Sequence, residues 1–532
     1  MSTSSQNNQE KPLEKNQKIQ KNQKNQKIQK NQEQEHYNIP QDGIPPGGRL
    51  SHLIHNWKKI TTNQWPLSVI NQGYQLQFQK KPQPWKLKPF TLTPVAQQAI
   101  DEAVEKFLLA QVIEKSPMQN DRYLSQFFTI QEANKIRPIL DCRKINEFLQ
   151  CHHFKMEGVP ALRELIEEND LITTIDLKDA YVVVPIHKES RQFLSFRHHG
   201  EIFQYRSLPF GLSVAPRVFS KLMRFALTPL REQGIRIVYY LDDICVLAKT
   251  KIESQRLTEL VIKHLQDLGF IISWEKSNIV PQKIQDFFGF TFNTTTMTIS
   301  VPPTKMKELT QRVRQLMRTT TPFSCRWIAA LLGKITSMIS AIGEALLHVR
   351  FLQRDLARNL RLQQYNWESP CPVSQAAKQE LEWWMEQAAN RNGLPIRPKP
   401  VDLQVPDLTV YVDASDTGWG VASRVLKTSG FWTKKESELS INTRELMTIR
   451  FALQLHKERY RNCNILVYSD NKTAIRYASK FGGTASALLQ QLALDIQEIY
   501  NEYNITLRVQ HIAGIKNTTA DRLSRQKPPV HE

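Results

Sequence analysis

Cysteine is scarce in this sequence of 532 residues, and the six cysteines are scattered along the chain. No two are spaced as Cys-x-x-Cys and no Cys-Cys-His-Cys knuckle occurs, so the common structural zinc motifs are excluded. The N-terminus lacks the apolar core of a secretory signal, and no apolar run of about 18 residues could cross a membrane. We therefore expect an intracellular protein, cytoplasmic or nuclear, that is neither secreted nor associated with a membrane.

Acidic residues are outnumbered, since 71 Lys and Arg against 51 Asp and Glu give a net charge of +20. Residues 1–35 hold seven Lys and four Glu, a net +3, so the remainder of the chain still carries +17. A body with this charge is typical of a protein that binds a polyanion, usually nucleic acid. The alternative is that the charge serves solubility alone.

Two segments of unusual composition divide the chain. Near the N-terminus the tripeptide Lys-Asn-Gln recurs four times. Such a tract cannot bury enough apolar surface to offset its ordering entropy, so residues 1–42 are predicted to be a disordered tail. A proline-rich stretch at 393–406 is predicted to be a linker. Apolar spacing predicts helices over 95–113 and about 374–389, mixed short strands and helices over 125–300, and a mainly helical region over 302–365.

Asp242 and Asp243 lie between two β-rich runs, a pattern that predicts a hairpin with both carboxylates at its turn. Upstream, the β-branched run 171–175 ends at Asp176. Each acid has an ordinary alternative, as a turn former or a cap. Carboxylates from separate strands can hold two Mg²⁺ ions about 4 Å apart, the arrangement that suits phosphoryl transfer. The three acids together therefore favour a nucleotidyl-transfer site.

Five sequence blocks occur in the order of the motifs of the reverse transcriptase family, which the chain resembles over roughly residues 120–525. One such block is weak evidence, whereas five in order are strong. The first block resembles the fingers strand that grips the triphosphate, and the last resembles the primer grip. The blocks are Arg137–Asn146, Asp176–Tyr181, Leu208–Phe219, Tyr240–Asp243 and Asp286–Phe290.

The resemblance implies a role for each matching residue. Asp176 and Asp242 would be the principal metal ligands, with Asp243 as a nearby third acid. Arg137 would contact the incoming triphosphate, for which its planar guanidinium is suited, and Lys135 is a second candidate. Tyr181 would lie under the deoxyribose as a steric gate against a 2′-hydroxyl. Further nucleotide or template contacts are implied for Asp179, Ala180, Phe210 and Gly211, and a primer grip for Phe288, Gly289 and Phe290.

Two other predictions concern the same region. Lys276 is a candidate general acid for the leaving pyrophosphate, although a solvated surface lysine is the favoured alternative. The apolar residues that follow Gly211 are spaced for a core-facing helix, so they indicate packing and not chemistry. They are Ala215, Val218, Phe219, Leu222 and Ala226.

A second set of acids lies in the C-terminal quarter of the chain. Singly, each has an ordinary interpretation: Asp413 as a turn former, Glu445 in a capping box with Asn442, Asp470 as a helix cap and Asp521 as a surface acid. Together they resemble the four acids of RNase H, on a predicted element order of βββ-α-β-α-α-β-α. The resemblance implies that all four bind metal. His511 matches the mobile histidine of that family near the scissile phosphate, with a plain strand-end histidine as the alternative.

A short motif of a different enzyme class also occurs among these C-terminal acids. The tripeptide 416–418 is Asp-Thr-Gly, the three-residue signature of aspartic proteases. It follows Asp413 by three residues, and no separate segment of protease size is available around it. We therefore predict a turn here and no protease site.

The resemblance implies an α+β and α/β multidomain fold: a right-hand polymerase with fingers, palm and thumb, followed by an RNase H-like α/β domain. The predicted parts are the tail 1–42, an N-terminal extension with the start of the fingers at 43–119, fingers and palm at 120–300, thumb and connection helices at 301–392, the linker 393–406, and RNase H at 407–528. The family phrases look most like DIRS-type retrotransposons, with Gypsy-like and pararetroviral enzymes as close relatives.

The expected function is RNA-directed and DNA-directed DNA synthesis, together with cleavage of RNA in RNA–DNA hybrids, replicating a retrotransposon. Two Mg²⁺ per active site are implied, with Mn²⁺ as a substitute. The implied partners are an RNA template, a DNA primer, the RNA–DNA hybrid and dNTPs, besides an element-encoded coat protein and tyrosine recombinase. The alternatives are a nucleic-acid-binding protein with inactive sites and a structural component of a retroelement particle.

Overall fold

The computed structural model describes residues 42–526 apart from 86, 88–89, 118–120, 133–134, 398–404 and 480–481. The predicted tail therefore lies outside the described residues except at its last position, and the predicted linker is described only in part. No helix in the described ranges is long and apolar enough to cross a membrane. The chain divides into two compact units, Met1–Leu162 with Asp170–Gln282, and Arg163–Asn169 with Lys283–Glu532.

A sheet of strand order β10-β4-β8-β7 carries the first set of acids in the first unit. Strand β4 (Leu171–Lys178) pairs antiparallel with β8 (Asp243–Ala248), and β8 pairs with β7 (Arg236–Tyr240). On its other side β4 pairs with β10 (Asn278–Gln282) and with the short β9 (Ile271–Ile272). The predicted hairpin is thus confirmed, since β-branched and aromatic residues suit a pleated buried surface.

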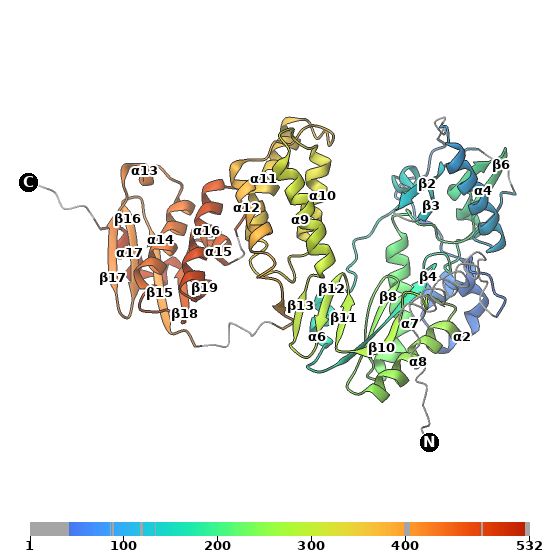
Figure 1. Cartoon of the computed structure of the whole chain (residues 1–532), viewed down its shortest axis with the longest axis horizontal. Helices are drawn as coiled ribbons and strands as arrows, with labels where there is room; N and C mark the ends of the chain where they lie inside the picture. Colours follow the sequence, from blue (N-terminus) through green and yellow to red (C-terminus); the bar gives the residue numbers. More distant parts are fainter. Residues whose placement is uncertain are drawn as a thin grey trace, which may run out of the picture. The chain divides into compact units, whose positions relative to one another are not determined.

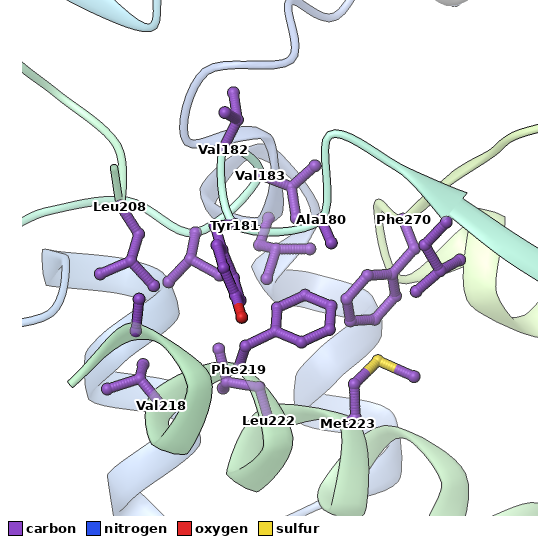
Figure 2. Close-up of a cluster of buried hydrophobic side chains, with 14 of the residues drawn as sticks. Ala180, Tyr181, Val182, Val183, Leu208, Val218, Phe219, Leu222, Met223 and Phe270 are labelled. Carbon is purple, nitrogen blue, oxygen red and sulfur yellow. The ribbon is translucent and has the colours of Figure 1, made fainter. Parts of the chain in front are cut away.

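Two long helices pack against this sheet (Figure 1). Helix α8 (Lys251–Asp267) contacts β4, β8 and β10, and helix α7 (Ala215–Glu232) contacts β7. The apolar face of α7 is buried as predicted. Figure 2 shows Phe219 of α7 between Tyr181 and Phe270, and their ring centroids lie 5.6 and 6.0 Å from that of Phe219. This core holds the segment after β4 in place beside α7.

Two smaller sheets complete the first unit. One has the order β1-β6-β5, built from β1 (Ile113–Lys115), β5 (Ser195–His198) and β6 (Glu201–Tyr205). The other is the hairpin of β2 (Phe127–Glu132) and β3 (Lys135–Leu140). Helix α4 (Pro94–Leu109) packs on β1, β2 and β3. The short helical elements of this region are η1 (Arg49–Leu53), α2 (Ile54–Ile60), α3 (Gln64–Gln72), α5 (Arg143–Asn146) and η2 (Lys188–Leu194). Helix α6 (Val159–Leu165) begins in the first unit and ends in the second.

The predicted helix 95–113 is too long, because α4 ends at Leu109. Gln111 adopts a left-handed backbone conformation with φ of +55°, which a helix cannot accommodate, and the chain then enters β1. Ile113 is buried in that strand, so its apolar side chain belongs to the sheet and not to the helix.

The second unit begins with a four-stranded antiparallel sheet of order β11-β12-β13-β14. Its strands are β11 (Ile284–Phe287), β12 (Phe290–Asn293), β13 (Thr298–Ser300) and β14 (Leu394–Pro395). Between β13 and β14 the chain is mainly helical, as predicted. The helices are α9 (Pro303–Arg318), α10 (Cys325–Thr336), η3 (Leu347–Val349), α11 (Arg350–Leu362) and α12 (Gln375–Glu386).

A five-stranded sheet of order β17-β16-β15-β18-β19 follows. Strands β15 (Leu408–Ala414), β16 (Gly418–Ser423) and β17 (Lys427–Phe431) are antiparallel, whereas β18 (Asn464–Ser469) and β19 (Thr506–His511) join in parallel. Figure 1 shows α14 and α16 side by side next to this sheet. The helices are α13 (Lys434–Ser437), α14 (Ile441–His456), α15 (Lys472–Ser479), α16 (Ala487–Glu502), η5 (Gly514–Lys516) and α17 (Thr518–Ser524).

The predicted order βββ-α-β-α-α-β-α is confirmed, with the short α13 as an addition. Helix α17 lies very close to β16, because a Cβ atom on Gly420 would stand 2.3 Å from the carbonyl oxygen of Ala520. Only glycine permits this approach. The close packing holds α17, which carries Asp521, against β16 and against β15, the strand that carries Asp413.

Candidate functional site

The turn that joins β7 to β8 presents the paired aspartates. Tyr240 and Asp243 are the last cross-strand partners, so Leu241 and Asp242 form a two-residue turn. Leu241 has φ of +54°, a conformation that bulky residues seldom adopt and that tight hairpin turns require at their first central position. Backbone strain of this kind is concentrated at functional sites.

Asp176 lies directly opposite Asp243 across the β4–β8 pair. The backbone N–H of Leu177 donates to the carbonyl oxygen of Asp242 at 2.9 Å, which fixes the turn against β4. The structure therefore brings Asp176, Asp242 and Asp243 together from two strands and one turn, as the sequence predicted for a carboxylate site. Whether these residues bind metal stays a prediction.

The three carboxylates stand in a partly dry environment. Burial, followed by the negative charges of Asp242 and Asp176, raises the pKa of Asp243 to about 6. Burial is also the main reason that the pKa of Asp242 is raised. The Oδ1 atom of Asp176 is buried and accepts no hydrogen bond from any described residue. A buried carboxylate oxygen that accepts no hydrogen bond costs free energy, which the nearby ammonium of Lys276 offsets in part and a bound cation would offset further.

Two neighbours of Asp176 come from the loop after β9. Lys276, a candidate general acid, places its Nζ 3.5 Å from Oδ1 of Asp176, although its side chain is largely exposed. Ser277 accepts a hydrogen bond from the backbone N–H of Asp176 at 3.0 Å and donates one to the carbonyl of Ser273 at 2.7 Å. Sequence reasoning missed Ser277, whose only local signal is its position beside Lys276.

Tyr181 and Phe210 form an aromatic pair in the first unit, and their ring centroids lie 4.9 Å apart. Tyr181 is buried, whereas Phe210 is exposed. Gly211 has φ of +92°, and its carbonyl oxygen accepts a hydrogen bond from Nδ2 of Asn146 at 2.9 Å. The exposed ring of Phe210 thus packs against Tyr181, and the backbone that follows it is fixed by the hydrogen bond from Asn146 to Gly211.

The other predicted nucleotide contacts belong to the same unit. Arg137 lies on β3 opposite Ile130 and is exposed, while the side chain of Lys135 is outside what the structure describes. Asp179 adopts a left-handed conformation with φ of +52° at the end of β4, and Ala180 behind it is buried. These positions are compatible with nucleotide binding, and their roles stay predictions.

The predicted primer-grip residues form the turn between β11 and β12 in the second unit. Phe288 and Gly289 have φ of +53° and +73°, and Phe290 begins β12 with its side chain buried. The carbonyl of Gly289 accepts a hydrogen bond from Nζ of Lys305 at 2.9 Å. The hairpin is a rigid support, and primer contact stays a prediction.

Three of the four C-terminal acids converge. Asp413 near the end of β15, Glu445 on α14 and Asp470 just after β18 place ligand atoms within 4.8 Å of one another, so this group could hold a metal ion. Asp521 is outside that group, but its charge acts on Asp413. Its Oδ1 atom accepts a hydrogen bond from Nε of Arg525 at 2.6 Å.

Burial raises the pKa of Asp413 to about 6 and that of Glu445 to about 8, and in each case the neighbouring acids add to the shift. Hydrogen bonds orient these groups, one of them from Ser469 Oγ to Oε2 of Glu445 at 3.5 Å. Ser524 Oγ donates to Oδ2 of Asp413 at 2.6 Å, and the backbone N–H of Ala414 donates to Oε1 of Glu445 at 3.3 Å. Ser524 was missed in the sequence, although its spacing of three from Asp521 puts both on one helix face.

His511 ends β19, where it is the partner of Ser469 and is exposed. Ser469 precedes Asp470, so the histidine lies at the same sheet edge as the acids. A Cβ atom on Gly514 would stand 3.0 Å from Oδ2 of Asp470, which shows how closely the loop after β19 approaches the cluster.

The structure removes two ordinary interpretations of the acids. Helix α14 is capped by Ser440, whose side chain accepts from the backbone N–H of Thr443, so Asn442 does not form the capping box with Glu445. The N–H of Ala474 in α15 is capped by Asn471 Oδ1 at 2.9 Å, and not by Asp470. Glu445 and Asp470 are therefore not explained as helix caps.

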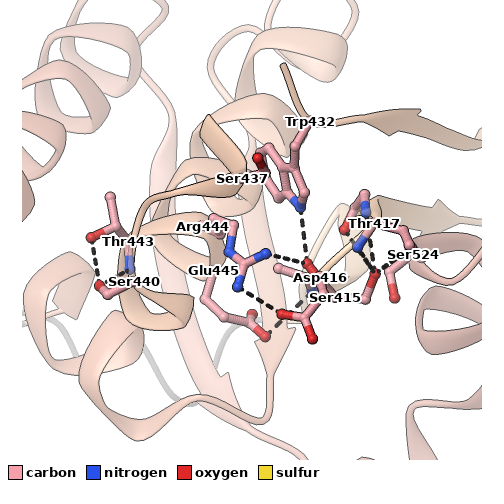
Figure 3. Close-up of polar contacts among 12 residues, drawn as sticks. Ser415, Asp416, Thr417, Trp432, Ser437, Ser440, Thr443, Arg444, Glu445 and Ser524 are labelled. Carbon is pink, nitrogen blue, oxygen red and sulfur yellow. Dashed lines mark hydrogen bonds and ion pairs between the residues drawn. The ribbon is translucent and has the colours of Figure 1, made fainter. Parts of the chain in front are cut away.

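Asp416 and Thr417 of the tripeptide that resembles a protease signature lie in the turn between β15 and β16, as predicted, and Gly418 begins β16. Asp416 is almost fully exposed and pairs with Arg444 at 2.9 Å. Figure 3 shows Arg444 and Trp432 both donating to the carbonyl oxygen of Ser415, at 3.0 and 2.9 Å. The loop is a rigid support for the end of β15, and Arg444 is a further residue that sequence reasoning missed.

Comparisons with known proteins agree with this geometry. Residues 118–292 match the model of the family described as reverse transcriptase (RNA-dependent DNA polymerase). The chain is 22% identical over 457 residues to the enzymatic polyprotein of Figwort mosaic virus, covering 83% of this chain and 63% of that one. It is 22% identical over 245 residues to the Tf2-3 transposon polyprotein of Schizosaccharomyces pombe, covering 45% of this chain and 18% of that one.

The fold is similar to solved structures of the foamy viral protease-reverse transcriptase. One, in complex with an RNA/DNA hybrid, has a TM-score of 0.51 and 16% identity, covering 93% of this chain and 64% of that one. Another, in complex with double-stranded DNA, has a TM-score of 0.50 and 16% identity, covering 87% and 81%. The chain spans less than two thirds of the length of the two polyproteins it matches.

The fold class predicted from the sequence is therefore confirmed as a right-hand polymerase followed by an RNase H-like α/β domain. The chain contains a reverse transcriptase domain of the kind found in the polyproteins of retrotransposons and pararetroviruses.

Proposed function

We propose that the first unit catalyses DNA synthesis directed by an RNA template, and also by a DNA template. The observation that carries this proposal is the convergence of Asp176, Asp242 and Asp243 at a strained hairpin beside β4. The rigid strands hold the carboxylates in place before any ligand arrives, so their positions cost no reorganisation during the reaction.

The residues fit the divalent cations that reverse transcriptases use. Asp176 offers a buried oxygen that accepts no hydrogen bond from any described residue, and burial, followed by repulsion from Asp242 and Asp176, raises the pKa of Asp243. Asp176 and Asp242 would hold Mg²⁺ or Mn²⁺, with Asp243 beside them. When bound, two such ions activate the attacking hydroxyl and stabilise the leaving pyrophosphate.

The nucleotide would lie between the acids and the aromatic pair. Tyr181 would set the width of the pocket under the sugar, because its ring is fixed by Phe219 on one side and Phe210 on the other. Arg137 would contact the triphosphate, with Lys135 as a further cation. Asp179, Ala180, Phe210 and Gly211 would contact nucleotide or template, and Phe288, Gly289 and Phe290 would contact the primer.

A second activity is proposed for the C-terminal α/β domain, the cleavage of RNA in RNA–DNA hybrids. Asp413, Glu445 and Asp470 would hold the cations, and Asp521 would complete the site from α17. The donor set suits Mg²⁺ or Mn²⁺, because it consists of carboxylates alone. His511 would move protons or assist product release at the same sheet edge.

The proposed partners are an RNA template, a DNA primer, RNA–DNA hybrid and dNTPs. A net charge of +20 supports binding to a polyanion, and the foamy viral relative was solved with such a hybrid. Contacts to the backbone would dominate, since a polymerase must accept any sequence. We further propose a retrotransposon of the DIRS type as the source, with an element-encoded coat protein and tyrosine recombinase as partners.

The predicted boundaries stand as part of this proposal. Fingers and palm would occupy 120–300, the thumb and connection 301–392, and RNase H 407–528. The division into compact units falls instead at residues 282 and 283, because the β11–β12 hairpin packs with the sheet that follows it.

The decisive experiment measures incorporation of radiolabelled dTTP on poly(rA)/oligo(dT) with Mg²⁺, comparing the wild-type chain with Asp242→Asn. Incorporation by the wild type alone supports an RNA-directed DNA polymerase with its site at the hairpin. Incorporation by neither, from folded protein that still binds the hybrid, would favour a nucleic-acid-binding protein with inactive sites.

A further inference from the structure

Three metal-ligating side chains meet at a second place in the first unit, outside the residues assigned to nucleotide chemistry. Asp101 lies on α4, and His198 and His199 lie where β5 turns into β6. The Nε2 atoms of the two histidines stand 3.3 and 3.0 Å from Oδ1 of Asp101. The ligand atoms of all three residues lie within 4.8 Å of one another.

The hairpin turn explains why two adjacent histidines face one carboxylate. Consecutive residues of a strand point to opposite faces, which would separate two neighbouring imidazoles. His198 is the last paired residue of β5, with Glu201 as its partner, so His199 and Gly200 form the turn. Both turn residues have positive φ, +45° and +83°, as tight hairpin turns require. His199 therefore does not follow the alternation of a strand, and the centroids of the two imidazole rings lie 4.2 Å apart.

The carboxylate is held in position from its own helix. Gln97 lies one turn earlier on α4 and donates a hydrogen bond to Oδ1 of Asp101 at 2.7 Å. Ile100 beside it is buried, which anchors this turn of the helix in the core. Side chains that bind metal commonly have such a neighbouring hydrogen bond, because it orients the ligand atom. His198 is mostly enclosed, whereas His199 is open to solvent.

We propose that Asp101, His198 and His199 bind one Zn²⁺ ion, with water as the fourth ligand. Tetrahedral zinc with bonds of about 2.0–2.1 Å separates its ligand atoms by roughly 3.3 Å, which is close to both observed distances. Two imidazoles with one carboxylate favour zinc over magnesium, since magnesium prefers oxygen ligands alone. The site is therefore chemically distinct from both carboxylate clusters.

The ion would join two elements that are separate in the sequence. Helix α4 packs on β2 and β3, and β6 pairs with β1 just after α4. A metal ion bound by both α4 and the β5–β6 turn would restrain α4, the helix against which the β2–β3 hairpin packs. The site is structural in this reading, and it does not depend on the proposed polymerase activity.

The test uses Co²⁺ as a probe, because tetrahedral Co²⁺ absorbs visible light and replaces Zn²⁺. Metal-free full-length protein is titrated with Co²⁺ in saturating Mg²⁺, which occupies the carboxylate clusters. The wild type is expected to show the tetrahedral absorption with one Co²⁺ per chain, and Zn²⁺ should abolish the signal. The double variant His198→Gln/His199→Asn should lack it.

Two further variants make the outcome decisive. The adjacent pair His152 and His153 is exposed in the same unit, so His152→Gln/His153→Gln removes as many histidines and should keep the absorption. If the double histidine variant does not fold, Asp101→Asn provides the test. This substitution preserves the shape of the side chain and should reduce Co²⁺ affinity at least tenfold. No tetrahedral signal from the wild type, or equal signals from all variants, would mean that Asp101 and the histidines are joined by hydrogen bonds alone.

Discussion

Asp176 and Asp243 face each other as a cross-strand pair of β4 and β8, and the backbone N–H of Leu177 on β4 donates a hydrogen bond to the carbonyl oxygen of Asp242. Like charges directly opposite each other destabilise a sheet, so this pair is a cost to the fold. Burial is the main cause of the raised pKa of Asp243, and repulsion from Asp242 and Asp176 adds to it. A cation placed among the carboxylates would remove that repulsion, which is the physical basis of the first prediction.

Asp242→Asn should reduce DNA synthesis by about a thousandfold or more, because the lost carboxylate contributes several kcal/mol of transition-state stabilisation through its cation. Cleavage of RNA in a hybrid should be unchanged. Both activities are measured on the same purified full-length protein. Asp267→Asn, on an exposed acid of the same unit, is the matched control. Loss of both activities in folded Asp242→Asn protein would contradict two separate sites.

Asp413→Asn should have the opposite effect, with hybrid cleavage reduced by about a thousandfold and DNA synthesis retained. Ser524 can still hydrogen-bond to the amide, so the fold should persist and the loss should come from the missing charge. The control is Asp416→Asn, three residues away and almost fully exposed. Cleavage is followed with a labelled hybrid on a gel, and an unaffected Asp413→Asn protein would refute the site.

Tyr181→Val should weaken discrimination against ribonucleotides by at least tenfold, about 1.4 kcal/mol, because it removes the ring that would exclude a 2′-hydroxyl. Tyr181→Phe keeps the ring packed between Phe210 and Phe219 and should keep the discrimination. The measurement compares kcat/KM for dTTP and UTP on one template. Equal selectivity in the valine variant and the wild type would remove Tyr181 from the nucleotide pocket.

Glu380 provides a pH-dependent prediction about stability. It is buried on α12, and its carboxylate accepts hydrogen bonds from the backbone N–H groups of Phe351 and Leu352. Burial outweighs these bonds and raises the pKa of Glu380 from 4.5 to about 8. The folded chain therefore binds a proton that the unfolded chain has released between these pH values. The contribution to stability is present at low pH and is lost as pH rises towards 8.

Glu380→Gln should remove this dependence, which amounts to at most about 1.4 kcal/mol per pH unit between pH 5 and 8. The free energy of unfolding is measured with urea at several pH values by tryptophan fluorescence, to which Trp383 and Trp384 on the same helix contribute. Glu386→Gln, at the exposed end of that helix, should keep the slope of the wild type. An unchanged slope in Glu380→Gln would show that the carboxyl is already ionised in the fold.

Local patterns in the sequence determined much of the fold. The hairpin around Asp242, the core-facing helix α7 and the order of helices and strands along the C-terminal domain were all predictable, because turn chemistry and apolar periodicity act between near neighbours. The end of α4 was not predictable, because the apolar periodicity continues beyond the last residue of the helix. Gln111 ends the helix by adopting a positive φ, which the periodic pattern does not reveal. The buried run Val182–Ile186 forms a turn and a bend followed by two isolated β-bridges, although its β-branched residues favour a regular strand.

The sequence by itself determined which acids were available and the order in which they occur. Only the tertiary structure decided which of them meet. Asp413, Glu445 and Asp470 converge while Asp521 stands outside the group, and Asp101 joins two histidines that no motif connects to it. These contacts depend on strand register and on helix packing between distant segments, where a shift of one residue would turn every side chain to the other face. Ser277 hydrogen-bonds to the backbone of Asp176 and Ser524 to the carboxylate of Asp413, and both partners are distant in the sequence, so spacing alone could not pair them.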